Sequence, residues 1–326
     1  RLAESLLSLT NRIIHMKSGL WRSDLERIQE LEKRQIRIMG SDQDLVSRIY
    51  WLLEDCKRYG TLPFAGLARA GFIAVQLLRS MVTVGVLGQQ EYNAFMMSLE
   101  TVGSRMTRDF ATLNRETFLQ RYGHLRPGTY DIRSPRYDEA PDFYFDWSSR
   151  NKKSKERPEQ FAPSLPQLNR VECLLKEHGL EHNALELFDF LKAGIEGREH
   201  SKFVFTRSLS NAISLFKELG VEYGFSADDC AYADIGIIRE LYISTRDPKN
   251  LLGQSIESGR RRYNLTKHLI LPSLIVNADD VWAFHMPRYE PNYVTDKAAV
   301  GHVTTDDDDR SALHGSILLI SSADPG

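Results

Sequence analysis

The sequence predicts a mainly α-helical protein with a short β-containing segment at its C-terminal end. Apolar residues recur at spacings of three and four over most of residues 2–271, which is the period of an amphipathic helix. After Pro272 the pattern changes to short apolar runs bounded by proline and aspartate, which is typical of strands. The composition, 42% hydrophobic and 26% charged, is that of a globular chain and excludes disorder of the whole.

Three amphipathic helices are expected in the first part of the chain. Their apolar positions fall within residues 2–13, 25–31 and 45–53. A serine followed by an aspartate precedes the second and the third run and offers an N-cap, at Ser23-Asp24 and at Ser41-Asp42. Gly40 and Gly60 are expected to end these two helices.

Residues 62–87 form the most apolar stretch. Arg69 and Arg79 interrupt it, so its charge-free pieces are shorter than the roughly 20 residues that a membrane span needs. We therefore expect a buried core helix, with Pro63 in its first turn. A further helix is expected at residues 89–110. The side chains expected to point inward from it are Tyr92, Phe95, Met96, Leu99 and Met106.

Helical periodicity ends near Tyr122. Residues 123–147 contain three prolines and many aromatic residues without a regular period, and their aromatic content predicts an ordered irregular segment. Residues 148–166 are polar and basic, and we interpret them as a surface linker. Helical pattern resumes over residues 167–178, 184–195, 203–219, 226–243 and 251–268. Strand-like runs follow at residues 281–284, 298–303 and 316–320.

These patterns divide the chain into four parts. The predicted parts are a first helical subdomain, the linker, a second helical subdomain and the start of a further unit, at residues 1–147, 148–166, 167–271 and 272–326. The chain begins without a methionine and stops straight after a strand-like run. We therefore expect it to be a piece of a longer protein.

Charge, cysteine content and missing motifs argue against several classes of protein. Lys and Arg number 42 against 44 Asp and Glu, a formal net charge of −2, which does not suit a surface built to follow nucleic-acid phosphates. Cys56, Cys173 and Cys230 stand far apart, so we expect no disulfide framework and place the protein in the reducing cytoplasm. The sequence contains no nucleotide-binding glycine loop, serine-hydrolase elbow or zinc-protease motif.

No metal site is expected. His178 and His182 are four residues apart, but Gly179 between them is expected to end the helix that would bring both to one metal. The four adjacent carboxylates at residues 306–309 lack the alternating ligand spacing of a calcium loop. A solvated loop is the simpler interpretation of that run.

Two places carry candidate binding residues. The first is residues 118–137, where the candidates are His124, Arg126, Asp131 and Arg136. Such a loop could cradle phosphate, because guanidinium presents a planar fork to paired oxygens, or it could be a structural knot in which Asp131 pairs with an arginine. The second is an expected helix start at which Arg198 and Lys202 project from one face. Alone, such a pair is usually a solvated face.

Both places resemble one enzyme superfamily. Residues 118–137, FLQRYGHLRPGTYDIRSPRY, resemble the segment of phosphoenolpyruvate-synthase-like enzymes and rifampicin phosphotransferases that joins the ATP-binding half to later domains. Residues 198–202, REHSK, are similar to the REYPK-type motif of those families. Residues 317–326 resemble the first strand and turn of their swivelling phosphohistidine domain. Residues 49–71, with the HLRPGTYDI wording, are most similar to the L-glutamine kinase-like branch.

The resemblance implies a phosphotransferase in three parts. An ATP-grasp domain binds ATP with Mg²⁺, a mobile histidine takes the β-phosphoryl group, and this histidine swings to the acceptor site while AMP and phosphate are released. The present chain would supply the acceptor-binding central helical domain. Because the phosphohistidine would lie beyond Gly326, the chain alone is expected to be inactive and to hold neither ATP nor metal.

The resemblance also suggests roles for individual residues. The residues expected to bind the substrate and its phosphoryl group are Arg198, Lys202, His124, Arg126, Asp131 and Arg136. We expect residues 123–137 to line a cleft between the helical sets, with Asp131 bonded to a nearby arginine and both His124 and Arg126 facing the cleft. The expected partners are the other two domains and a small-molecule acceptor, with neither nucleic acid nor membrane. A non-catalytic helical scaffold or partner-binding module is the alternative.

Overall fold

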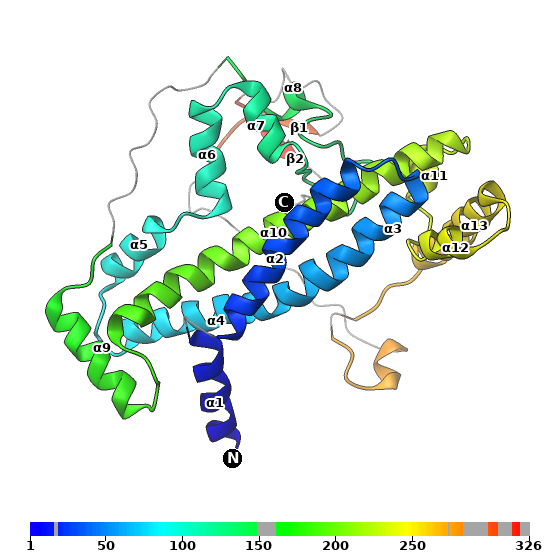
Figure 1. Cartoon of the computed structure of the whole chain (residues 1–326). Helices are drawn as coiled ribbons and strands as arrows, with labels where there is room; N and C mark the ends of the chain where they lie inside the picture. The colour runs from blue at the N-terminus through cyan, green and yellow to red at the C-terminus, as the bar shows by residue number, and fades with distance from the viewer. Residues whose placement is uncertain (16–18, 149–160, 273, 283–298, 306–314, 320–326) are drawn as a thin grey trace.

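The computed structural model describes residues 1–15, 19–148, 161–272, 274–282, 299–305 and 315–319. Over these ranges the protein is mainly helical, with a short two-stranded sheet near the C-terminal end, and the predicted fold class is confirmed. The long helices lie side by side as a bundle, with the shorter helices around it (Figure 1).

The helices and strands follow one another in a simple order. The helices of the first half are α1 (Leu2–Ile14), α2 (Leu20–Met39), α3 (Leu45–Asp55), the π-helical turn η1 (Cys56–Thr61), α4 (Leu62–Thr83), α5 (Gln89–Ser98), α6 (Val102–Thr112), α7 (Arg115–Tyr122) and α8 (Pro141–Tyr144). The elements of the second half are α9 (Leu165–Glu177), α10 (Ala184–Glu222), α11 (Ala227–Cys230), α12 (Ile237–Ile243), α13 (Pro248–Thr266), the 3-10 turn η2 (Ala278–Val281), β1 (Val303–Thr305) and β2 (Ile317–Leu319).

Helix α10 is the centre of the bundle. It runs for 39 residues and packs on α2, α3 and α4. Four of its large apolar side chains are 2% exposed or less, those of Leu187, Phe190, Leu191 and Leu219. Apolar burial repeated along such a length is typical of a core helix, and it makes α10 the rigid element on which other segments are placed.

The sequence predicted that this helix would break between residues 195 and 203, and that prediction is wrong. Gly197, which was expected to precede a helix start, lies inside α10. The nearby glycines serve a close crossing of helices instead. A Cβ on Gly194 would lie 3.4 Å from the carbonyl oxygen of Ala70, and one on Gly71 would lie 3.2 Å from the carbonyl oxygen of Gly194. Glycine lets the backbones of α4 and α10 approach closely here.

The break expected at Gly60 is also wrong. Helix α3, the π turn η1 and α4 run on as one helix from Leu45 to Thr83. Gly60 is a packing residue, because an added Cβ would lie 2.7 Å from the Cβ of Phe205 and 3.1 Å from the Cδ2 of Leu31. The π turn brings this part of the backbone against α10 and α2, where there is no room for a side chain.

Two other expected helices are divided by turns. Residues 89–110 form α5 and α6, because Thr101 caps the second helix by accepting a 3.2 Å hydrogen bond from the backbone N of Ser104. Residues 226–243 form α11 and α12, again with turns between them. Short capped helices of this kind are hard to distinguish from one longer helix when apolar spacing is the main signal.

The predicted caps are confirmed at one position and wrong at two. Gly40 is the C-cap of α2, as expected. Helix α2 begins earlier than the serine-aspartate pair suggested, so Ser23 and Asp24 lie in its first turns. The cap of α3 is Asp44, whose side chain accepts a 3.0 Å hydrogen bond from the backbone N of Ser47.

The bundle holds two clusters of buried apolar side chains. One joins α1, α2, α4 and α9 to the first half of α10, and the other joins α3, α12 and α13 to its second half. Each cluster combines residues from both of the helical subdomains that the sequence suggested. The boundaries of these subdomains remain a prediction. Of the side chains expected to point inward from residues 89–110, two are buried, Phe95 and Leu99, and three are half-buried, Tyr92, Met96 and Met106.

The C-terminal strands form a parallel pair. Strand β1 pairs with β2, with Val303 opposite Ile317. Of the strand-like run expected at residues 281–284, the structure describes Val281 and Trp282. Val281 is the last residue of the 3-10 turn η2 and Trp282 is its C-cap, so neither residue forms a strand. Residues 149–160 of the expected linker and the four carboxylates at 306–309 lie outside the described residues.

One helix of the described part, Leu45–Thr83, is long and apolar enough to cross a membrane by length and composition. A single such helix is weak evidence for a span, because the core helix of a soluble protein passes the same test. One third of its apolar window, 33%, is buried within the described structure. Its α4 part buries Leu67, Ala70 and Leu78 in the first apolar cluster. This packing favours the core helix that the sequence suggests.

Candidate functional site

The candidate site consists of the irregular segment after α7 and the stretch of α10 on which it lies. The chain turns back on itself here. The backbone N of Tyr137 donates to the carbonyl oxygen of Leu125 (2.9 Å), and that of Asp138 donates to the carbonyl oxygen of Gly123 (3.1 Å). These bonds close residues 123–138 into a loop, which we call the α7 loop. The expectation of an ordered irregular segment is confirmed.

Aromatic side chains hold the base of the α7 loop. The ring of Phe118 is fully buried and lies 5.0 to 5.9 Å from the rings of Tyr122, Phe145 and Trp147. Tyr144 adds a 2.9 Å hydrogen bond from its hydroxyl to a carbonyl oxygen of the loop. Aromatic pairs stabilise a fold by about 0.5–1.5 kcal/mol each beyond simple burial. This cluster explains how a segment without a regular period is held in one conformation.

Arg126 fastens the α7 loop to α10. Its side chain is buried, with 6% of the residue exposed. Within the loop, Nη1 donates to the carbonyl oxygens of Asp131 (3.4 Å) and Ser134 (3.1 Å). Toward α10, Nε donates to Oγ of Ser210 (3.3 Å) and Nη2 donates to Oγ of Ser214 (3.0 Å). All these acceptors are neutral, and burial lowers the pKa of the guanidinium.

His124 is buried on the same face of α10. Its Nδ1 accepts a 3.3 Å hydrogen bond from Nε of Arg207, and its ring packs 4.7 Å from that of Phe203. Its carbonyl oxygen accepts a 2.6 Å bond from Oγ of Ser210. Burial, aided by the positive charges of Arg207 and Arg136, lowers the pKa of His124 to about 3. The imidazole is therefore neutral at pH 7, with its proton on Nε2, for which the described residues supply no hydrogen-bond acceptor.

The other charged groups of the α7 loop are paired. Arg136 donates to both carboxylate oxygens of Asp138 and, at 2.9 Å, to Oδ1 of Asn211 on α10. Arg133 donates from Nε and Nη2 to the two oxygens of Asp131, both at 3.0 Å, and these hydrogen bonds lower the pKa of Asp131. The expected pairing of Asp131 with an arginine of its own loop is confirmed.

The structure places His124 and Arg126 beneath the α7 loop and not on the wall of an open cleft. Both side chains are directed at α10, and together they are bonded to Ser210, Ser214 and Arg207. The expectation that they face a cleft is corrected by this burial. The physical reason is that the loop is short and rich in prolines and aromatic residues, so it closes down on the helix and covers its polar groups.

Arg207 is a candidate residue that reasoning from the sequence missed. Besides His124, it bonds the carbonyl oxygen of Arg121 through Nη2 at 2.8 Å, and its guanidinium lies 5.6 Å from the centre of the Phe203 ring. Both hydrogen-bond acceptors are neutral, and burial lowers the pKa of Arg207. The one feature of the sequence that marks Arg207 is its spacing of four residues from Phe203. This spacing is too common in helices to identify a functional arginine.

Arg198 and Lys202 share one face of α10, as predicted, but they lie inside the helix and not at its start. The helix begins after Asn183, so its positive dipole end is about 22 Å away along the axis from position 198. The guanidinium of Arg198 lies 5.0 Å over the ring of Phe72 and 3.5 Å from a carboxylate oxygen of Glu199. Lys202 is exposed to solvent. The positive end of the helix dipole is therefore too far away to help Arg198 and Lys202 bind an anion.

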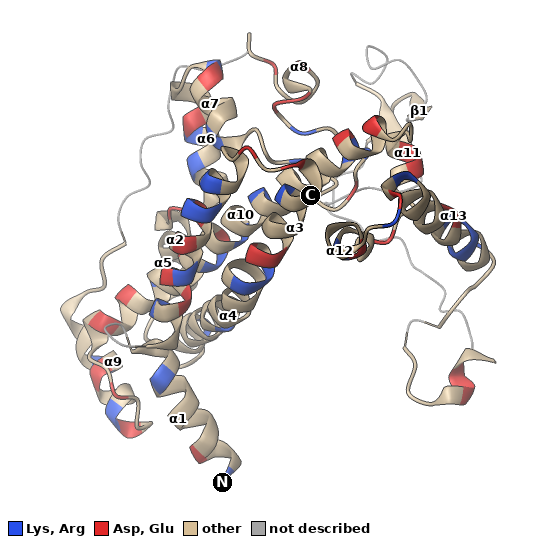
Figure 2. Ribbon diagram, turned by 45° about the vertical axis from the view of Figure 1, so that its right-hand side comes forward, with Lys and Arg blue, Asp and Glu red and all other residues tan. Residues whose placement is uncertain are grey.

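The six predicted residues thus form two groups. His124, Arg126, Asp131 and Arg136 belong to the α7 loop, whose contacts with α10 centre on Ser210. His124 nevertheless packs on Phe203, which follows Lys202, and at 1.5 Å per residue the axis of α10 advances about 8 Å from position 198 to position 203. Figure 2 shows basic and acidic residues interspersed along the helices around α10. The charged groups are arranged along the helix and do not gather in one basic patch.

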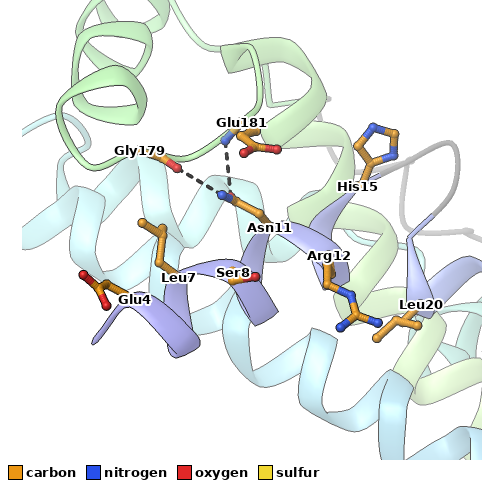
Figure 3. Close-up of a pocket in the computed structure, with 9 residues that line it drawn as sticks. All are labelled: Glu4, Leu7, Ser8, Asn11, Arg12, His15, Leu20, Gly179 and Glu181. Atoms are coloured by element: carbon orange, nitrogen blue, oxygen red, sulfur yellow. Dashed lines mark hydrogen bonds between the residues drawn. The ribbon is translucent and has the colours of Figure 1, made fainter. Parts of the chain in front are cut away.

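A pocket of about 550 Å³ lies at the other end of the bundle, between α1 and the turn that follows α9 (Figure 3). Asn11 bridges the two segments. Its Nδ2 donates to the carbonyl oxygen of Gly179 (3.0 Å), and its Oδ1 accepts from the backbone N of Glu181 (3.3 Å). Charged side chains of both signs, Glu4 and Arg12, line the same pocket.

The histidines near this pocket do not form a metal site. Gly179 has a φ of +68° and ends α9 after His178, as predicted, so His178 and His182 do not share a helix. The ring of His182 lies 5.9 Å from that of His15. Within the part of the chain that the structure describes, no group of three His, Cys, Asp or Glu side chains is placed to hold a metal ion.

The chemistry available around the α7 loop is the binding of negative charge. Burial raises the pKa of Tyr122 to about 12 and that of the Cys56 thiol to about 11, and the neutral His124 is a weak base. None of these three groups is activated as a nucleophile near pH 7. The guanidinium of Arg207 and the cations of Arg198 and Lys202 can hold an anion.

Comparison with known proteins finds no relative of this chain: no protein-family model, no curated protein and no solved structure matches it.

Proposed function

We propose that this chain is the acceptor-binding central domain of an ATP-dependent phosphotransferase. In the intact enzyme the β-phosphoryl group of ATP passes through a phosphohistidine to a small-molecule acceptor, and AMP and phosphate are released. The favoured activity is L-glutamine kinase-like, and a phosphoenolpyruvate-synthase-like activity is the next choice. The proposal rests on the wording of residues 118–137 and 198–202 and on how the structure relates them.

The observation that supports the proposal best is the attachment of the α7 loop to α10. Two segments that resemble the same superfamily lie far apart in the sequence. Arg126 and His124 tie the first of them to the helix that carries the second. A loop held on a rigid helix is a common way to fix the geometry of a binding site.

In this proposal Arg198 and Lys202 bind the phosphoryl group while it passes from the phosphohistidine to the acceptor. Their half-exposed and exposed side chains on one face of α10 are accessible to an incoming phosphohistidine. Phosphoryl transfer passes through a loose transition state, in which fixed positive charge near the equatorial oxygens lowers the barrier. His124, Arg126, Asp131 and Arg136 act as positioning residues that fix the α7 loop.

The cofactors and partners of the proposal belong to the intact enzyme. ATP and Mg²⁺ are held by an ATP-grasp domain, and the phosphohistidine belongs to a swivelling domain. The acceptor is a small molecule, and the proposal includes neither nucleic acid nor a membrane. The enzyme is placed in the cytoplasm.

A non-catalytic helical scaffold is the second candidate, and one observation favours it. Arg126, Arg133 and Arg136 all donate to partners within the chain. A structural knot needs this arrangement, whereas a phosphate site needs free guanidinium groups. The two candidate functions therefore differ in whether this domain binds a substrate.

Incubating the intact protein with β-labelled ATP and Mg²⁺ separates the two candidates. The phosphotransferase proposal predicts acid-labile, base-stable label on a histidine, and AMP release that rises when the true acceptor is added from a panel of amino acids and sugars. A protein that leaves ATP unchanged, or that forms ADP without labelled histidine, would contradict the proposal and favour the scaffold.

A further inference from the structure

A second polar site lies between α2 and α4, away from the α7 loop. It is a pocket of about 200 Å³, which we call the α2–α4 pocket. Its floor is apolar and includes Ile13 and Trp21, which are 3% and 7% exposed. Its charged side chains are Asp24 and Arg27 from α2 and Arg69 from α4. The volume is below the roughly 300 Å³ at which pockets for drug-sized ligands begin, so only a small molecule fits.

The carboxylate of Asp24 is the unusual group of this pocket. It is half-buried, and burial raises its pKa, while the positive charges of Arg27 and Arg69 act in the opposite direction. Both arginines are close enough to affect its charge, and no hydrogen bond or ion pair between Asp24 and either of them is found among the described residues. Because the side chain is only half-buried, its carboxylate oxygens can accept hydrogen bonds from a ligand that enters the pocket.

Gly66 of α4 lets the carboxylate of Asp24 lie directly against the backbone of that helix. A Cβ added at Gly66 would overlap Oδ2 of Asp24. Residue 66 lies inside α4, where glycine is less favourable than alanine by about 1 kcal/mol. The helix thus contains an unfavourable residue at a position where a methyl group would displace the Asp24 carboxylate.

The two arginines and the aspartate together define the chemistry of a ligand. Arg27 and Arg69 are exposed at the rim and come from different helices, so an anionic group between them would be held from two sides. Asp24 needs a hydrogen-bond donor. The apolar floor at Trp21 suits a short carbon chain.

We infer that the α2–α4 pocket binds a small carboxylic acid that carries a hydroxyl or ammonium group on the adjacent carbon. The carboxylate lies between Arg27 and Arg69, and the neighbouring donor group bonds to Asp24. This inference does not depend on the proposed function, because it uses none of the residues of the α7 loop and neither Arg198 nor Lys202. Leu20 lines this pocket as well as the one in Figure 3, so the two pockets adjoin at that side chain.

A matched series of three-carbon compounds tests the inference by calorimetric titration of the full chain. L-lactate and L-alanine carry both groups, propionate lacks the donor, and lactamide lacks the carboxylate. We expect lactate, alanine or both to bind, and propionate and lactamide to bind at least about tenfold more weakly, because each loses a charge-assisted hydrogen bond. Absence of binding by lactate and alanine at millimolar concentration, or equal binding of propionate, would overturn the inference.

Variants assign the binding to this pocket. Arg69→Ala and Asp24→Ala should each weaken binding at least about tenfold. Arg79→Ala removes an exposed arginine from the same helix, outside the pocket, and should leave the affinity unchanged. Asp24→Asn keeps an acceptor oxygen but removes the charge, so it should weaken binding of alanine more than binding of lactate.

Gly66→Ala provides an additional check, because it keeps every charged residue but its methyl group displaces the Asp24 carboxylate. It should abolish binding. Since this change could also disturb the packing of α2 on α4, Arg69→Ala at the exposed rim is the deciding variant. If both Arg69→Ala and Asp24→Ala bind the probes as tightly as the unchanged protein, the ligand lies elsewhere and the inference is wrong.

Discussion

The α7 loop and the α2–α4 pocket use the same residue types in opposite ways. In the loop, Arg126 is buried and donates to carbonyl and hydroxyl oxygens on both sides. In the pocket, Arg27 and Arg69 are exposed and lie near an aspartate with which, among the described residues, they form no ion pair. The comparison teaches that the partners of an arginine, and not its presence, show whether it stabilises the fold or is available to a ligand.

The largest expected effect that follows from this comparison is on stability. Arg126→Ala should lower the free energy of unfolding by about 2–4 kcal/mol, because it removes the hydrogen bond to the carbonyl oxygen of Ser134 and the bonds to Ser210 and Ser214 on α10. Arg69→Ala should change it by about 0.5 kcal/mol or less. Urea denaturation of the two variants measures both values. Equal losses in the two would show that the distinction between the regions is false.

Two glycines of the long helices extend the comparison to packing. Gly60→Ala should cost about 1–3 kcal/mol of stability, because its Cβ would meet the Cβ of Phe205 at 2.7 Å. Gly197→Ala is the matched control, since an added Cβ there meets nothing within 4 Å inside α10. It should stabilise the protein by up to about 1 kcal/mol, because alanine is the better helix former. Thermal unfolding of both variants would contradict this account if Gly60→Ala were the more stable.

The buried imidazole of the α7 loop predicts a loss of stability in acid. The folded state holds the pKa of His124 at about 3, below the value of about 6.5 in an unfolded chain, so the unfolded chain binds more protons between these values. Stability should fall as the pH drops below about 6.5, by at most about 1.4 kcal/mol per pH unit from this group.

A variant isolates this contribution of His124. His124→Gln should remove that part of the pH dependence when the free energy of unfolding is measured between neutral and mildly acidic pH. His178→Gln alters an exposed histidine and serves as the control, which should keep the slope of the unchanged protein. The same slope in His124→Gln as in the control would contradict the assignment of a neutral, buried imidazole.

The smallest effect is expected at the edge of the α7 loop. The Arg133 and Asp131 side chains are 59% and 39% exposed, so Arg133→Ala should cost less than about 1 kcal/mol. The pKa of Asp131 should rise in this variant, because the hydrogen bonds from Arg133 hold it low. An NMR titration of the Asp131 carboxyl measures that change. A large loss of stability in Arg133→Ala would mean that this pair, and not Arg126, holds the loop.

The sequence predicted those features that depend on neighbours along the chain. Apolar spacing gave the helical class, and the Asp131 to Arg133 pair, two residues apart, followed from local charge. It could not reveal that Gly60 faces Phe205 or that His124 bonds to Arg207, because these partners are brought together only by the packing of α10. A glycine that ends a helix and a glycine in the interior of a helix look alike in a sequence, and this ambiguity produced both wrong breaks.

The candidate sites show the same limit. The arginines of residues 118–137 stood out as a cluster, but whether they were free or bonded depended on Ser210 and Ser214, which carry no signal of their own. The α2–α4 pocket left no mark in the sequence, because Asp24, Gly66 and Arg69 meet only through the packing of two helices.

The most direct test of the proposed function separates its two half-reactions in the intact protein. Arg198→Ala and Lys202→Ala should leave the labelling of histidine by β-labelled ATP unchanged and slow the transfer of label to the acceptor, by about 10²-fold or more if each cation stabilises the transition state. Lys217→Ala, an exposed lysine of the same helix, is the control and should change neither rate. If both half-reactions run at the unchanged rate in Arg198→Ala and Lys202→Ala, these residues do not receive the phosphoryl group and the proposal is contradicted.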